Sequence, residues 1–130
     1  PGALPEGAAH LVRDGGVEPL GVLPETALVD LVRRAVALVH PSVYEGFGMP
    51  VREALALGTP VLAADVPAVR EVAAGGACLL PPDVPEAWAR ALRELADPAR
   101  GPATPSPEAV AAARAATWRS AARALLAALG

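Results

Sequence analysis

Two glutamates, eight residues apart, flank a glycine-containing turn and offer groups that could bind a polar ligand. Glu45 comes before the turn and Glu53 follows it. The segment between them contains Gly46, Gly48 and Pro50. A carboxylate accepts hydrogen bonds from two adjacent hydroxyls, and each hydrogen bond to a charged group contributes about 1.5–3 kcal/mol. The pair therefore predicts recognition of a ligand that carries several hydroxyl groups.

The same turn is expected to open directly into a helix. Pro50 suits the first helical turn, where its missing N–H needs no partner. Gly46 and Gly48 permit torsions that other residues avoid and allow a ligand to approach the backbone closely. The unpaired N–H groups at the start of such a helix, together with its dipole, attract an anion. A phosphate position beside hydroxyl-binding carboxylates predicts a nucleotide-sugar site.

The elements expected around this turn alternate between strands and helices. Short apolar runs predict buried parallel strands at 17–23, 36–40, 60–64 and 77–80. Apolar periodicity and proline or capping signals predict helices at 25–35, 50–57, 67–74, 85–95 and 106–129. The alternation predicts an α/β fold, with a parallel sheet and helices on its faces. The turn then follows the carboxyl end of a strand, where open α/β sheets bind phosphorylated ligands.

The 130 residues are expected to form a single partial domain. Residues 17–96 are predicted to form the α/β core, 97–105 a linker rich in proline and glycine, and 106–130 a terminal helix. The first residue is proline rather than methionine, and no charged-then-apolar leader pattern follows it. We therefore expect the chain to be part of a longer polypeptide.

Charge and composition exclude several classes of partner. The net charge of −3 and the absence of a basic stripe argue against binding to nucleic acid. No apolar stretch approaches the length of a transmembrane helix, although association with a membrane surface stays open. Cys78 is the single cysteine, so no internal disulfide is possible and a cytoplasmic location is favoured. His10 and His40 lack partners at ligand spacing, and His40 is expected to play a structural or supporting role at a strand end.

A longer stretch around the turn carries a resemblance to a known family. Residues 40–61 read HPSVYEGFGMPVREALALGTPV and resemble the signature of the retaining group 1, or family 4, glycosyltransferases. The resemblance continues in order over residues 17–130. It implies the GT-B architecture, in which two Rossmann-like domains face each other across a cleft. The signature belongs to the C-terminal half, which binds the donor.

The resemblance also implies a role for each residue of the site. Glu45 matches the glutamate that contacts donor-sugar hydroxyls and is discussed as catalytic, and Glu53 matches the one that binds the ribose hydroxyls. The other substrate-binding residues that it implies are Gly46, Phe47, Gly48 and Met49 in the turn, with Leu23 beside the nucleobase. The donor would be a nucleoside-diphosphate sugar, transferred with retention and without a metal or other cofactor.

The chain departs from that family in one respect. The family carries an Arg and a Lys earlier in this domain to neutralise the diphosphate, whereas all eleven cationic residues here are Arg. An N-terminal domain that binds the acceptor is also expected as a missing partner. This chain alone is therefore predicted to have little or no transferase activity.

Two other functions are compatible with the same residues, and two more are disfavoured. A non-catalytic fragment that binds a nucleotide sugar or assists assembly would carry the same residues, as would another GT-B-shaped enzyme such as a sugar epimerase. A dinucleotide oxidoreductase is disfavoured because the chain has no G-x-G-x-x-G motif. Ser42 lacks a His and an Asp in triad order, so a hydrolase is also disfavoured.

Overall fold

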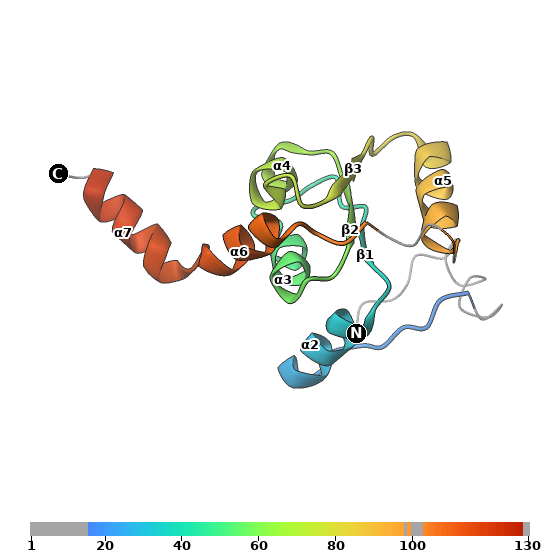
Figure 1. Cartoon of the computed structure of the whole chain (residues 1–130), viewed down its shortest axis with the longest axis horizontal. Coiled ribbons are helices and arrows are strands. Elements are labelled where there is room, and N and C mark those ends of the chain that lie inside the picture. The colour runs from blue at the N-terminus through green and yellow to red at the C-terminus, as the bar shows by residue number, and fades with distance from the viewer. Residues whose placement is uncertain (1–15, 98, 100–102, 129–130) are drawn as a thin grey trace. The chain divides into compact units, whose positions relative to one another are not determined.

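The computed structural model describes residues 16–97, 99 and 103–128. The chain forms two compact units, Pro1–Asp30 and Leu31–Gly130. The helices and strands (Figure 1) are α2 Glu25–Arg34, β1 Leu38–His40, α3 Met49–Leu57, β2 Val61–Ala64, α4 Pro67–Ala73, β3 Cys78–Leu80, α5 Pro85–Leu95, α6 Pro107–Ala115 and α7 Trp118–Ala128.

Three parallel strands form the sheet, in the order β1-β2-β3. Leu38 pairs with Val61 at the start of the first ladder, and Leu62 pairs with Cys78 at the start of the second. Helix α3 connects β1 to β2, and α4 connects β2 to β3, so each parallel connection is a helical crossover. The predicted α/β class, a Rossmann-like parallel sheet with flanking helices, is confirmed.

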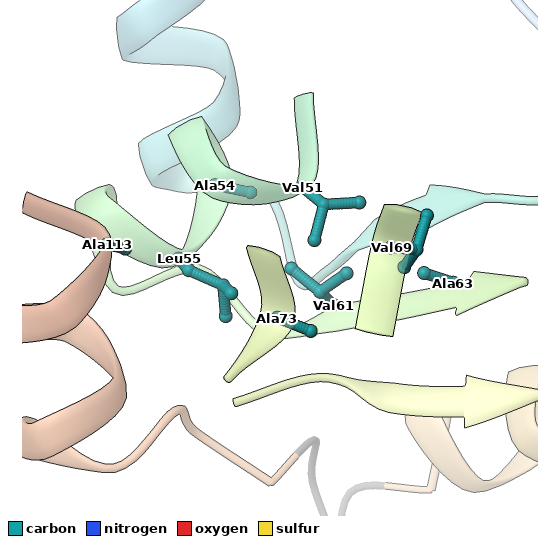
Figure 2. Packing of buried hydrophobic residues seen from close by; sticks show 8 residues of the cluster. All are labelled: Val51, Ala54, Leu55, Val61, Ala63, Val69, Ala73 and Ala113. Carbon is teal, nitrogen blue, oxygen red and sulfur yellow. The ribbon is translucent and has the colours of Figure 1, made fainter. Parts of the chain in front are cut away.

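The central strand separates two hydrophobic clusters. Every residue of β2 is buried, and successive side chains of a strand point to opposite faces of a sheet. Val61 and Ala63 join α3, α4 and α6 in the larger cluster (Figure 2), whereas Leu62 packs with Leu80 and with Ala91 of α5. Figure 1 accordingly shows α3 and α4 on one side of the sheet and α5 on the other.

The C-terminal end of α3 is closed by several hydrogen bonds. Gly58 adopts the left-handed conformation, with φ of 80°, that commonly ends a helix. The buried Thr59 donates from Oγ1 to the carbonyl of Val32 at 2.9 Å. Arg114 of α6 donates from Nε to the carbonyl of Ala56 at 2.7 Å, which places a cation at the negative end of the α3 dipole. The helix that follows the turn is therefore anchored at its far end.

Two sequence-based expectations about secondary structure are wrong. Residues 17–23 form no strand, and Val22 is 95% exposed. No strand in the described part of the chain pairs with this segment, and a strand needs such a partner for its backbone groups. The helix expected over 106–129 is two helices, since α6 ends at Ala115 and α7 begins at Trp118. The Thr117 N–H donates to Ser120 Oγ, and the Ser120 N–H donates to Thr117 Oγ1. This reciprocal pair, as in a capping box, starts a new helix.

The remaining predicted strands and helices agree with the observed bounds to within two residues at each end. The domain bounds at 17–96 and 97–105 stay predictions. None of the helices in the described part of the chain combines the length and the apolar character that crossing a membrane requires.

Candidate functional site

The turn lies at the carboxyl end of β1, between His40 and the first residue of α3, Met49. Its first part is bent by the Ser42 hydroxyl, which donates to the carbonyl of Tyr44 at 3.2 Å. Because β1 is parallel to β2, this end of the sheet also carries the ends of the other strands. The turn therefore occupies the edge at which open α/β sheets bind ligands.

Both carboxylate oxygens of Glu45 are held by the chain. Oε1 lies 2.7 Å from Nε2 of His40, the last residue of β1, and Oε2 accepts from the N–H of Gly48 at 3.3 Å. The Glu45 side chain keeps 19% of its surface exposed. A carboxylate offers about four acceptor positions, so roughly two remain for hydroxyl groups of a ligand. The carboxylate is thus oriented in advance and still able to bind.

The same contacts favour the charged form of Glu45. The hydrogen bond with His40 is the main reason that the pKa of Glu45 lies below its ordinary value, while partial burial opposes the shift and the Ser42 hydroxyl and Gly48 amide add to it. A carboxyl whose pKa is lower in the folded state stabilises the fold above its unfolded-state pKa, and this contribution is lost as the pH falls through the folded value. Glu45 is therefore an acceptor at neutral pH, and His40 Nε2 is the donor.

Gly48 joins the turn to α3 in a conformation that glycine favours. Its φ of 65° and ψ of 36° are left-handed, and it is buried. A Cβ at this position would lie 2.9 Å from Cγ2 of Val72 in α4. Arg52 N–H donates to the carbonyl of Gly48, so the amides of Met49 and Val51 precede the first helical hydrogen bond and have no acceptor within the helix.

The other predicted site residues take different positions. Glu53 is exposed on α3, whose neighbouring residues Ala54 and Leu55 are fully buried, so Glu53 points away from the core. Phe47 is 56% exposed, and the Arg52 guanidinium lies 5.5 Å from its ring centroid, within the range of a cation–π contact. Gly46 is exposed, with open space where a side chain would stand, and Met49 is half-buried. Leu23 is half-buried and belongs to the other compact unit, Pro1–Asp30.

Comparison with known proteins gives a family match over most of the chain. The family described as "Glycosyl transferases group 1" matches residues 2–97. The chain belongs to the group 1 glycosyltransferases. No solved structure gives a significant match.

Curated relatives of this glycosyltransferase chain include enzymes of two kinds. It is 43% identical to an O-antigen chain mannosyltransferase of Salmonella typhimurium, over 50% of this chain and 18% of the relative. It is 37% identical to O-antigen chain mannosyltransferase B of Escherichia coli, over 65% and 23%. It is 38% identical to a D-inositol 3-phosphate glycosyltransferase of Streptomyces scabiei, over 94% and 29%. The chain thus spans less than a third of the length of each of these relatives.

Two polar pairs of this group 1 chain were not predicted as pairs. His40 was expected to play a supporting role, but nothing in the five-residue spacing indicated that it bonds Glu45. Asp65, at the end of β2, accepts from Nε and, at 2.9 Å, from Nη2 of Arg70, and both the pairing with Arg70 and their mutual charge effect lower its pKa. In both pairs the second residue follows the strand-end residue by five positions. This spacing is the sequence signal that could have predicted the two pairs.

A hollow of about 350 Å³ lies at the opposite edge of the sheet, where β2 and β3 begin. Its lining includes Val61, Cys78 and Ser106 but no charged side chain. Nor do any three His, Cys, Asp or Glu side chains in the described part of the chain gather closely enough to hold a metal ion. The charged groups of the turn therefore lie at the other edge of the sheet from this hollow.

The conformation of Gly48 predicts a difference between two glycine substitutions in the turn. Gly48→Ala should destabilise the protein by about 1–3 kcal/mol, because alanine is strained at positive φ and its methyl meets Val72. Gly46→Ala, where a Cβ meets nothing within 4 Å, should change stability by less than about 0.5 kcal/mol. Urea unfolding of both variants measures the difference. Equal effects would show that the left-handed geometry of Gly48 does not constrain the turn.

Proposed function

We propose that this chain is the donor-binding part of a retaining glycosyltransferase that takes a hexosyl group from a nucleoside-diphosphate sugar. The observation that carries the proposal is the Glu45 carboxylate, held by His40 and Gly48 at the carboxyl end of β1 and directly before α3. Two carboxylate acceptor positions and the first amides of a helix lie within one short turn. Sugar hydroxyls and a diphosphate need these two kinds of group.

The two glutamates are proposed to bind opposite ends of the donor. Glu45 receives hydroxyls of the sugar, and the exposed Glu53 binds the ribose hydroxyls from the solvent side of α3. The diphosphate lies between them, near the amides of Met49 and Val51. A helix start supplies only about half an elementary charge. The diphosphate therefore needs further cations, which we expect from other parts of the complete protein, and the 130-residue chain alone should have little or no activity.

The relatives favour transfer over the rival functions. Two of them are named as mannosyltransferases and the third as a D-inositol 3-phosphate glycosyltransferase. The proposal also includes a hexosyl donor, transfer to an acceptor bound by a second domain, independence from metal, and a cytoplasmic or membrane-peripheral location. A sugar epimerase would turn over its substrate without an acceptor. Product analysis with and without acceptor would therefore distinguish the two enzymes.

Replacement of Glu53 tests the donor site directly. In the complete protein, Glu53→Ala should weaken binding of the donor nucleoside diphosphate by about 10- to 150-fold, the loss expected for one charged hydrogen-bonding pair. Isothermal titration calorimetry, beginning with a panel of nucleoside diphosphates, measures the affinity. Glu86→Ala is the matched control, since Glu86 is also an exposed glutamate near the start of a helix but lies in α5.

The outcomes of this titration separate the candidate functions. Weaker binding in Glu53→Ala but not in Glu86→Ala supports the donor site. Unchanged binding in both variants would remove Glu53 from it. A wild-type protein that binds none of the nucleoside diphosphates would overturn the proposed function. Binding without turnover in the complete protein would favour the non-catalytic alternative.

A further inference from the structure

The geometry points to His40 as a positioning residue that holds the Glu45 carboxylate in the orientation needed for its work on the donor sugar. This inference rests on the proposed function, in which Glu45 contacts sugar hydroxyls. It adds a residue to the site, because His40 reaches the donor only through Glu45.

The contact is short and shielded. His40 Nε2 and Glu45 Oε1 are 2.7 Å apart, and their side chains are only 14% and 19% exposed. Charge-assisted hydrogen bonds of this length are about twice as strong as neutral ones. Limited exposure reduces competition from water. The imidazole of His40 can therefore fix the orientation of the Glu45 carboxylate.

The two partners of Glu45 are anchored in different elements. His40 belongs to β1, where it pairs with Ala63 of the fully buried strand β2. Gly48 is buried at the start of α3. Glu45 lies between them in a segment without regular structure, flanked by the exposed Tyr44 and Gly46. The carboxylate thus ties the strand to the helix, and its orientation depends on both ties.

Loss of the imidazole should remove the shorter of the His40 and Gly48 contacts that hold the Glu45 carboxylate. The Gly48 amide, at 3.3 Å, is the longer of the two contacts and allows the carboxylate to rotate about it. Misplacement of a reacting group by about 1 Å costs roughly 100-fold in rate. Donor affinity should change far less, because the ribose and diphosphate contacts are made elsewhere. A split between kcat and donor affinity therefore distinguishes positioning from general support of the fold.

The test compares three variants of the complete protein. His40→Leu removes the donor group, His40→Gln restores an amide N–H close to the position of Nε2, and Val39→Thr alters the neighbouring, partly exposed position of β1 without removing the imidazole. His40→Leu should lower kcat by about 10- to 100-fold with donor Kd within about twofold of wild type. His40→Gln should recover a large part of the loss, and Val39→Thr should keep wild-type kcat.

A titration of Glu45 provides a readout that needs no turnover. Carbon-13 NMR of glutamate labelled at the side-chain carboxyl follows Glu45, whose signal is assigned by its absence in Glu45→Gln. The pKa of Glu45 should rise in His40→Leu and stay unchanged in Val39→Thr, since His40 is the main cause of its lowering.

An unchanged pKa of Glu45 in folded His40→Leu would overturn the pairing. A raised pKa of Glu45 with unchanged kcat would overturn the positioning role, while the proposed function would stand. A wild-type protein that binds no nucleotide sugar would overturn the proposed function and, with it, the role of His40 in the site.

Discussion

Glu45→Gln in the complete protein should lower kcat by about 10²- to 10³-fold while donor affinity changes by only a few-fold. The amide keeps the size of the carboxylate and can still accept from the Gly48 N–H through its oxygen. It lacks the negative charge that strengthens hydrogen bonds to sugar hydroxyls. Steady-state kinetics combined with calorimetry separates these two effects.

The expected split follows from what Glu45 already contacts. Its two intrachain hydrogen bonds fix the carboxylate before any ligand arrives, so binding need not spend free energy on orienting it. The favourable interaction can then be reserved for the transition state, which affects kcat rather than affinity. A glutamate whose only role was to stabilise the turn would behave differently, because its loss would reduce the stability of the fold and leave kcat per folded molecule unchanged.

Asp65→Asn is the matched control for Glu45→Gln. Asp65 also lies at the carboxyl end of a strand and is also held through both oxygens, but by Arg70 of α4. If removing any anchored strand-end carboxylate disturbed this edge of the sheet, both substitutions would reduce kcat equally. A normal kcat in Asp65→Asn and a large loss in Glu45→Gln would assign the effect to Glu45. Wild-type kcat in Glu45→Gln would exclude it from the reaction.

Much of the fold was predictable because the sequence marks where elements begin. Four helices start next to a proline, at Pro50, Pro67, Pro85 and Pro107, each at one of the first two helical positions. The short apolar runs before the first three of these helices form β1, β2 and β3. Position in the chain therefore predicted which residues meet at the carboxyl edge, including the turn before α3.

The errors arise where local signals depend on distant partners. Residues 17–23 have the composition of a strand but lack a paired neighbour, and composition carries no information about pairing. The alanine-rich terminal segment favours helix throughout, so helix propensity hides the break at Thr117. The bond between His40 and Glu45 depends on the path of the turn, which Gly48 sets through its left-handed torsions.

Leu55→Ala should lower the free energy of unfolding by about 2–5 kcal/mol, the largest stability effect expected among the described residues. Leu55 is completely buried on α3 and packs in the larger cluster. The other buried members of this cluster are alanine or valine, and the largest fully buried side chains in the described part of the chain are Leu55, Val51 and Val69. Short side chains cannot swing into a cavity, so the loss should lie in the upper half of this range.

This substitution also separates stability from the chemistry of the site, because Leu55 and Glu53 lie on the same helix but on opposite sides. Thermal unfolding of Leu55→Ala should show a melting temperature lower by at least about 10 °C. Donor affinity measured well below that temperature should match wild type. The control is Leu92→Ala, in which the replaced leucine is 43% exposed on α5 and its loss should cost less than about 1 kcal/mol. If Leu55→Ala lost as little unfolding free energy as Leu92→Ala, the core would not depend on α3. Weaker donor binding in folded Leu55→Ala would show that packing beneath α3 also sets the geometry of the turn.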